Sequence, residues 1–126
     1  GGIRAWKAAG YHTDVLDEVS AEVFAQQYKL NNNITLLDVR KKSEFRSQHI
    51  EGAENFPLDF INKNIHQLDK NSQYFVHCAG GYRSVIAASI LKSRGYNHIV
   101  NIQGGFKALS NTGLTKTAYH IPETML

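Results

Sequence analysis

Short apolar runs alternate with longer segments of helical spacing along this chain. The runs at residues 34–39, 73–77 and 97–102 are rich in β-branched and aromatic side chains, which is typical of buried strands. Segments with helical spacing predict helices at residues 21–28, 41–48, 58–68, 84–94 and 105–111, and residues 50–57 are expected to form a loop with a short strand. Strands that alternate with helices predict an α/β domain with a central, mainly parallel β-sheet flanked by helices.

Single residues mark some of the expected helix ends and inner faces. Ser20 precedes the first helix and is the residue type that caps helix N-termini. Val23 and Phe24 mark the expected inner face of that helix. Gly95 follows a basic turn and is expected to end the helix before it, because glycine readily adopts the left-handed conformation found after helix C-termini.

The only cysteine of the chain, Cys78, stands between a predicted strand and a predicted helix. Gly80 and Gly81 follow it and allow the backbone N–H groups to converge on one small anion near the helix N-terminus. These surroundings, together with Arg83, lower a cysteine pKa from about 8.5 to roughly 3.5–7.5. A structural cysteine at the end of a buried strand is the alternative, but it requires neither the two glycines nor the arginine. We therefore predict a reactive thiolate, with Arg83 binding an oxyanion or a persulfide.

Three segments of the sequence resemble the rhodanese family, sulfurtransferases that carry a sulfane sulfur as a cysteine persulfide. Residues 78–84 (CAGGYRS) are similar to its active-site loop, residues 36–57 to its LDVR-containing strand and loop, and residues 101–106 to its closing strand and glycine pair. The resemblance implies a rhodanese-like domain in which Cys78 is the catalytic residue. The substrate-binding residues that it implies are Ala79, Gly80, Gly81, Tyr82, Arg83 and Ser84.

Asp38 and Arg40 lie at the end of another predicted strand, from which their side chains can reach neighbouring loops. We expect a buried salt bridge that supports the site rather than a direct part in catalysis. His77 adjoins Cys78, but neighbours on a strand point to opposite faces. We therefore expect His77 to be buried behind the site and not to act as the base.

The resemblance implies sulfur transfer in two steps, with no cofactor. Thiosulfate or a low-molecular-weight persulfide would donate sulfur to Cys78, and a thiol, sulfite or cyanide would accept it. One alternative is a catalytically silent binding or regulatory module of a larger protein. The other is a cysteine phosphatase or arsenate reductase, whose loops resemble C-x-x-x-x-x-R, one residue longer than the C-x-x-x-x-R of Cys78 to Arg83.

Composition and charge narrow the classes of partner. The chain has 126 residues, of which 42% are hydrophobic and 20% charged, as expected for a soluble globular domain. Its net charge of +3 comes from scattered basic residues, which argues against a nucleic-acid partner. No apolar run reaches the roughly 18 residues of a membrane span. The six histidines lack metal-site spacing, and no second cysteine is present, so no metal is expected. A lone cysteine cannot form an internal disulfide, which favours a reducing, cytoplasmic location.

The first residues of the chain repeat a pattern from near its end. Residues 1–11 align with residues 104–114, since both segments begin Gly-Gly-apolar-basic-Ala and have glycine at the tenth position. We interpret residues 1–14 as the remnant of a preceding rhodanese-like repeat plus linker, the linker running over residues 11–17, and residues 15–126 as the rhodanese domain. An expression scar with an unrelated helix is the alternative. The loop and the repeat together resemble fusions that follow a metallo-β-lactamase-fold persulfide dioxygenase, which implies upstream domains of the same polypeptide as partners.

Overall fold

The computed structural model describes residues 16–31 and 33–121, so the expected remnant at residues 1–14 lies outside the described part. In chain order its elements are β1 (Asp17–Val19), α2 (Ala21–Leu30), β2 (Thr35–Asp38), α3 (Lys42–Ser47), β3 (Glu54–Asn55), η1 (Leu58–Phe60), α4 (Ile61–Asn64), η2 (Ile65–Gln67), β4 (Tyr74–His77), α5 (Tyr82–Ser93), β5 (Ile99–Ile102) and α6 (Gly105–Leu109). Strands and helices alternate as the sequence predicts.

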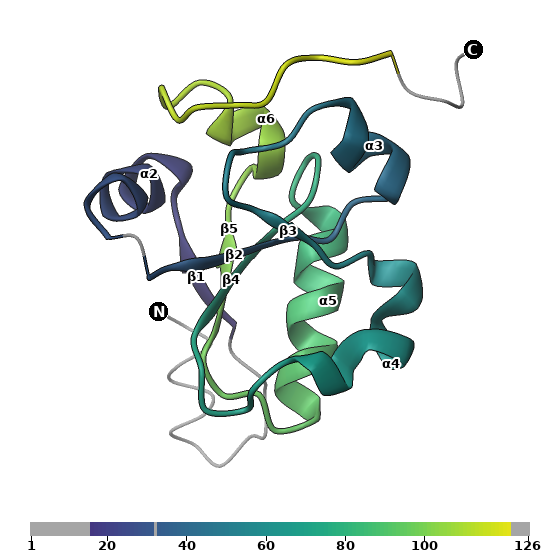
Figure 1. The fold of residues 1–126 in the computed structure, drawn as a ribbon. Helices are drawn as coiled ribbons and strands as arrows, with labels where there is room; N and C mark the ends of the chain where they lie inside the picture. The colour runs from purple at the N-terminus through teal and green to yellow at the C-terminus, as the bar shows by residue number, and fades with distance from the viewer. Residues whose placement is uncertain (1–15, 32, 122–126) are drawn as a thin grey trace.

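Within the described residues, five strands form one sheet in the order β1-β5-β4-β2-β3, and every pairing in it is parallel. Figure 1 shows α2 and α6 on one face of the sheet and α4 and α5 on the other. The predicted α/β fold with a parallel sheet flanked by helices is therefore confirmed. No helix in the described ranges is long and apolar enough to cross a bilayer.

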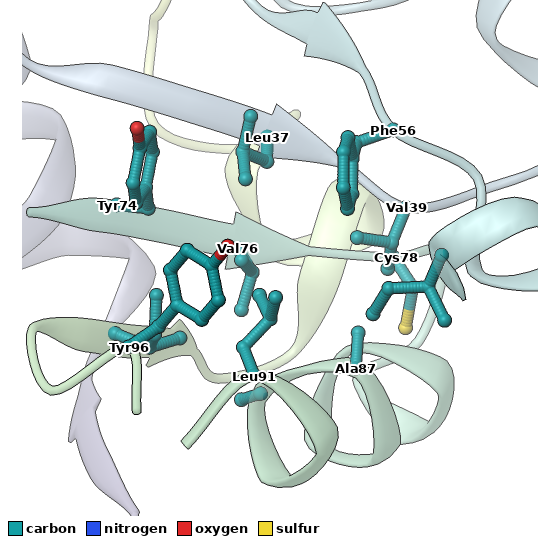
Figure 2. Packing of buried hydrophobic residues seen from close by; sticks show 12 residues of the cluster. Leu37, Val39, Phe56, Tyr74, Val76, Cys78, Ala87, Leu91 and Tyr96 are labelled. Carbon is teal, nitrogen blue, oxygen red and sulfur yellow. The ribbon is translucent and has the colours of Figure 1, made fainter. Parts of the chain in front are cut away.

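The alternation of side chains along β2 and β4 divides the core into two clusters. Leu36 and Phe75 pack on the face covered by α2 and α6, whereas Leu37 and Val76 pack on the face of α5. Figure 2 shows the second cluster, in which Cys78 lies beyond Val76 in the direction of the strand. All four residues of β4 are buried, which places the cysteine at the end of the central, most enclosed part of the sheet.

Some local expectations hold and others are wrong. Ser20 caps α2, with its hydroxyl accepting from the backbone N–H of Val23 at 3.2 Å, and Gly95 has a φ of +93° just after α5. Phe24 is fully buried, but the Val23 side chain is 45% exposed and does not belong to the inner face. The other buried residues of α2 are Ala21 and Ala25. Their side chains are small, so α2 can pack close to the sheet.

Two segments differ from the sequence prediction in their secondary structure. The end of the expected linker forms the edge strand β1, whose first two residues are exposed acids and give no apolar alternation to detect. The helix predicted at residues 58–68 is divided into η1, α4 and η2, because the capping backbone N–H groups bond three residues back at Ile61 and Leu68.

Helix α6 is attached directly to the backbone of the cysteine loop. The N–H of Phe106 donates to the carbonyl of Cys78 at 2.6 Å, and the N–H of Lys107 donates to the carbonyl of Ala79 at 3.1 Å. Gly105 has a φ of +60°, and a Cβ there would contact the carbonyl of Cys78 and lie 2.7 Å from the carbonyl oxygen of Ala79. The close approach of α6 to the loop therefore requires glycine at this position.

We expect Gly105→Ala to lower the free energy of unfolding by about 1–3 kcal/mol, because it adds a left-handed non-glycine residue and a clash with two carbonyl groups. Urea denaturation of both proteins measures this. Gly80→Ala is the matched control, since a Cβ at Gly80 would have no neighbour within 4 Å and its φ is not positive. Equal stability of the two variants would contradict the requirement for glycine at the α6 junction.

Candidate active site

Cys78 lies at the carboxyl edge of the sheet, where β4 gives way to the loop before α5. The residue is 1% exposed, and its Sγ accepts a hydrogen bond from the backbone N–H of Gly81 at 3.1 Å. The hydroxyl of Ser84, in the first turn of α5, lies 3.5 Å from the same sulfur. Gly81 occupies the N-cap position of α5 with a φ of +101°, which turns its N–H toward the cysteine.

The loop stabilises the thiolate form of Cys78. Burial raises the pKa of the Cys78 thiol, but hydrogen bonds from the Ser84 hydroxyl and from the backbone N–H groups of Ser84, Gly81 and Arg83 outweigh that effect, so the pKa lies below its ordinary value. These donors are fixed dipoles at a helix N-terminus, as the sequence suggested. The anion cradle is therefore built from amides and one hydroxyl.

The side chain of Arg83 is bonded to a carboxylate. Its Nη1 donates to Oε1 of Glu44 at 2.6 Å and its Nη2 donates to Oε2 at 3.0 Å, in a two-pronged salt bridge between α5 and α3. The hydrogen bond to Arg83 holds the pKa of Glu44 below its ordinary value, and the same bond raises the pKa of Arg83. The charge of the thiolate also contributes to the raised pKa of Arg83.

Glu44 is the site residue that the sequence analysis missed. It lies in the segment that resembles the rhodanese strand and loop, three residues after Lys41 at the start of α3. Its Oε1 also accepts from the backbone N–H of Lys41 at 3.1 Å, which is the reciprocal contact of a helix capping box. That spacing could have identified Glu44 as an N-terminal helix residue, but not its contact with Arg83.

A small hollow adjoins Arg83 on the side of β2 and η1. Its volume is about 30 Å³, which is enough for a few small polar atoms. The residues that line it are Val39, Lys41, Pro57, Leu58, Asp59 and Arg83. Two of these side chains, Lys41 and Arg83, are cationic and one, Asp59, is acidic, so the charged groups at the hollow carry a net positive charge that favours a small anion.

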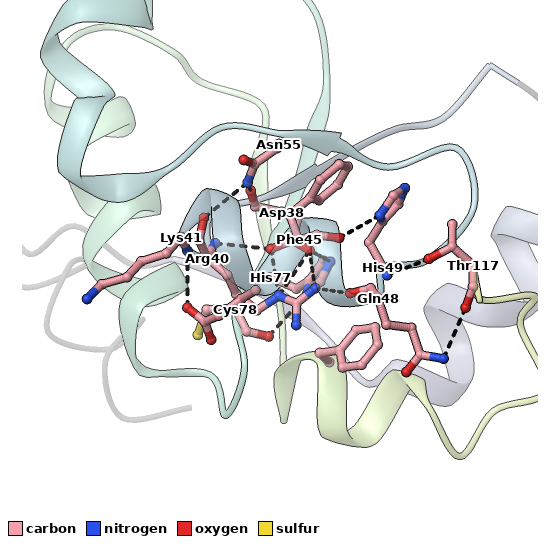
Figure 3. A network of polar contacts seen from close by, with 12 residues as sticks. Asp38, Arg40, Lys41, Phe45, Gln48, His49, Asn55, His77, Cys78 and Thr117 are labelled. Atoms are coloured by element: carbon pink, nitrogen blue, oxygen red, sulfur yellow. Dashed lines mark hydrogen bonds and ion pairs between the residues drawn. The ribbon is translucent and has the colours of Figure 1, made fainter. Parts of the chain in front are cut away.

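Asp38 and Arg40 form a buried ion pair beside the loop, as the sequence predicts. Nη2 of Arg40 lies 2.7 Å from Oδ2 of Asp38 and also donates to the carbonyl of Gln48 at 2.7 Å. The guanidinium lies over the ring of Phe106 at 4.2 Å, and Asn55 donates to the carbonyls of Asp38 and Arg40, both at 3.0 Å. Figure 3 shows this network joining β2 to α3 and β3. The hydrogen bonds between Asp38 and Arg40 hold together the loops around the cysteine, and among the described contacts neither side chain bonds to the sulfur of Cys78.

His77 is fully buried behind the loop, as expected. Its Nδ1 lies 3.1 Å from the carbonyl of Cys78, to which it donates, and its Nε2 lies 3.7 Å from Oδ2 of Asp38. Nε2 has no hydrogen-bond partner among the described residues. Burial lowers the pKa of His77, so the ring is neutral in the folded protein. The ring contacts the backbone of Cys78 and not its sulfur, which argues against a role as base.

The remaining loop residues have separate positions. Ala79 is tied to α6 through its carbonyl, Gly80 is open to its surroundings, and Tyr82 is 79% exposed at the start of α5. The structure thus brings Gly81, Ser84 and the backbone of Arg83 to the sulfur, while Tyr82 points away. Among the described residues, no group of three or more His, Cys, Asp or Glu side chains could hold a metal ion.

Comparison with known proteins matches this geometry to a family. The model of the rhodanese-like domain matches residues 20–112, which include all the strands from β2 to β5 and the cysteine loop. The chain belongs to the rhodanese-like domain family.

Several relatives of this rhodanese-like chain carry names that refer to sulfur transfer. It is 36% identical over 76 residues to the thiosulfate sulfurtransferase PspE of Escherichia coli, covering 59% of this chain and 72% of PspE. It is 26% identical over 100 residues to a sulfurtransferase of Allochromatium vinosum, covering 79% of this chain and 94% of the relative. It is 30% identical over 92 residues to the putative sulfur carrier protein YrkF of Bacillus subtilis, covering 73% of this chain and half of YrkF. These names support a rhodanese-type sulfurtransferase at the level of the family.

Solved structures agree with the fold. A rhodanese-like domain protein from Staphylococcus aureus superposes with a TM-score of 0.72 at 28% identity, covering 79% of this chain and 97% of the other. The solution structure of a rhodanese-like domain from Anabaena gives a TM-score of 0.74 at 26% identity, covering 82% and 80%. The single parallel sheet with helices on both faces is thus the architecture of this family.

We expect Ser84→Ala to raise the pKa of Cys78, because the hydroxyl is the largest single contribution that lowers it. The rate of alkylation by iodoacetamide as a function of pH reports this pKa, and its midpoint should move to higher pH. Ser93→Ala is the control on the same helix, since the Ser93 hydroxyl donates only to the carbonyl of Ile90 in the described contacts. An unchanged midpoint in Ser84→Ala would show that the amides alone stabilise the thiolate.

The buried, neutral His77 predicts a loss of stability in mild acid. Its pKa is lowered in the folded state, so below about pH 6.5 the unfolded chain binds a proton that the folded chain does not, and stability falls as the pH falls. We expect a loss of up to about 1.4 kcal/mol per pH unit between pH 6.5 and 5. Urea midpoints should show a flatter pH dependence for His77→Asn than for the wild type. His98→Asn, at an exposed position, should retain the wild-type slope, and parallel slopes for all three would refute the assignment.

Proposed function

We propose that this protein transfers sulfane sulfur through a persulfide on Cys78. The observation that carries the proposal is the buried sulfur of Cys78, which accepts from the Gly81 amide at 3.1 Å and has a thiol pKa lowered by loop hydrogen bonds. A thiolate is the nucleophilic form of cysteine, and the same amides can hold the negative charge of a persulfide. Ala79, Gly80, Tyr82 and Arg83 complete the proposed substrate-binding loop.

Two displacements at sulfur account for the reaction. In the first, the Cys78 thiolate attacks the outer sulfur of thiosulfate, the S–S bond of the donor breaks, and sulfite leaves with the electron pair. A low-molecular-weight persulfide would lose a thiolate in the same way. In the second, a thiol, sulfite or cyanide attacks the outer sulfur of the Cys78 persulfide, and the Cys78 thiolate is released. Both steps balance without an external oxidant or cofactor.

Two observations support sulfur transfer over the alternatives. Two of the relatives are named sulfurtransferases, with thiosulfate named for PspE. The loop retains the cysteine, both glycines and the arginine, whereas a silent binding module has no need of a thiol with a lowered pKa. The short loop from Cys78 to Arg83 also makes a smaller ring than the phosphatase-type loop that it resembles, which suits a sulfur atom better than a tetrahedral phosphate.

The setting of the domain is also part of the proposal. We suggest a reducing, cytoplasmic location, which preserves a persulfide carrier. We also suggest that residues 1–14 are the C-terminal remnant of a preceding rhodanese-like repeat plus linker. If the chain works beside a persulfide dioxygenase in one polypeptide, the sulfite made there would be an acceptor and thiosulfate a product. Some relatives are much longer than the match, since this chain spans half of YrkF.

Intact-mass spectrometry tests the proposal. After incubation with thiosulfate or with glutathione persulfide, the wild-type protein should gain the mass of one sulfur atom, and cyanide or sulfite should remove it. Cys78→Ser should show no gain while keeping the fold, because the hydroxyl is close in volume to the thiol. If Cys78→Ser gained the sulfur as well, another group would be the carrier. If neither protein gained it, the binding-module alternative would be favoured.

A further inference from the structure

Arg83 is the one cation of the cysteine loop, yet its guanidinium is bonded to Glu44 and has no recorded bond to the sulfur. We propose that Glu44 is the resting partner of Arg83, and that an anionic sulfur donor binds by displacing Glu44 from the guanidinium. Glu44 would then determine how tightly charged donors bind. This inference rests on the proposed sulfur transfer and names the residue that tunes its first step.

The salt bridge occupies both terminal nitrogens of Arg83 and can still be exchanged. Nη1 and Nη2 each donate to one oxygen of the same carboxylate, so the two-pronged fork formed by the terminal nitrogens is occupied by Glu44, and an anion that takes this fork must replace the carboxylate. The two side chains are 30% and 33% exposed, so water can replace either partner. Partly exposed ion pairs of this kind are weak, and an anion of higher charge can compete with a single carboxylate.

The thiolate is stabilised at rest by hydrogen bonds that do not involve the side chain of Arg83. The contributions that lower the pKa of Cys78 come from the Ser84 hydroxyl and from the backbone N–H groups of the loop. Arg83 follows Cys78 by five residues in the same loop, and the charge of Cys78 is one of the causes that raise the pKa of Arg83. The side chain is therefore available for a ligand that arrives at the sulfur from outside.

The two sides of the salt bridge face different hollows. Arg83 lines the hollow of about 30 Å³ together with Lys41 and Asp59, where a donor anion would meet two cations and one acid. Glu44 lines a second, more open cleft of about 180 Å³ that also contains Arg40 and Phe106. The charge of Arg40 already acts on Glu44, since it contributes to the lowered pKa of that carboxyl. A displaced Glu44 thus has room and a cation on its own side of the bridge.

This arrangement makes a prediction of definite sign. While Glu44 holds Arg83, the charges of the pair cancel, and a dianion such as thiosulfate must replace the carboxylate to bind the fork of the two terminal nitrogens. Removal of the carboxylate charge should therefore tighten thiosulfate binding. If Glu44 instead held Arg83 in the orientation that binds the donor, its removal would weaken binding.

Thiosulfate binding to Cys78→Ser protein, measured by isothermal titration calorimetry at low ionic strength, separates these outcomes without any chemistry. In that background, Glu44→Gln should lower the dissociation constant by roughly three- to tenfold, because it removes the competing ion pair. The glutamine can still accept from the N–H of Lys41. Arg83→Ala should weaken binding, and Glu44→Gln should give no gain when Arg83 is absent. Glu51→Gln, which removes an exposed acid remote from the loop, is the matched control for net charge.

Each other outcome overturns the inference. Weaker binding in Glu44→Gln would show that Glu44 orients Arg83 for the donor. An equal gain in the absence of Arg83, or in Glu51→Gln, would show that only the net charge of the protein matters. If thiosulfate bound to none of the variants, Arg83 would not be its binding site. Glu44→Asp, which keeps the charge but shortens the reach to Arg83, should also bind more tightly and replaces the glutamine variant if that protein does not fold. If the wild-type protein gained the mass of sulfur but Glu44→Gln bound thiosulfate as before, the role of Glu44 would be rejected and the proposed function would stand. If Glu44→Gln bound thiosulfate more tightly but the wild-type protein gained no mass, sulfur transfer would be rejected and the role of Glu44 in anion binding would stand.

Discussion

The carbonyl group of Cys78 is the point on which the geometry of the site depends. It accepts from the N–H of Phe106 at 2.6 Å and from Nδ1 of His77 at 3.1 Å, so both of its lone pairs are used in the interior. The end of β4 is thereby fixed against α6, and the backbone leaves the sheet in one direction. Only then can the Gly81 amide and the Ser84 hydroxyl, which belong to the next element, converge on the sulfur of Cys78.

A second layer of charge surrounds this point. Arg40 is held by Asp38 and by the carbonyl of Gln48, and its guanidinium lies over the ring of Phe106, the residue whose N–H fixes the cysteine carbonyl. Burial of an ion pair costs solvation free energy, which the several hydrogen bonds to both partners offset. The pair therefore contributes a fixed position for α6 and α3 more than it contributes net stability.

The sequence predicted what depends on neighbouring residues, and missed what depends on the fold. Ser20 and Gly95 act within one turn of their helices, so their roles follow from the residue type alone. The cysteine loop was predictable for the same reason, because the cradle, the glycines and the helix N-terminus are consecutive. Strand β1 was missed because its three residues give no strand pattern of their own, and their extended conformation comes from the pairing with β5. Glu44 was missed because its partner, Arg83, is brought near it only when α3 and α5 begin at the same edge of the sheet.

The loop amides and the charge of Arg83 act on the sulfur in different ways, and this difference has a chemical reason. Loop amides cannot leave the sulfur, so they stabilise the negative charge of the Cys78 thiolate and, in the reaction we propose, that of its persulfide as well. A free arginine beside a thiolate would attract every small anion, and would lower the reactivity of the thiolate by neutralising it. A carboxylate on Arg83 limits both effects while no donor is bound, because the bridge to Glu44 leaves little net charge at the mouth of the loop. In the mechanism we propose, the reactivity of the resting thiolate is set by Gly81 and Ser84, and the affinity for charged donors is set separately by the competition between donor and Glu44 for Arg83.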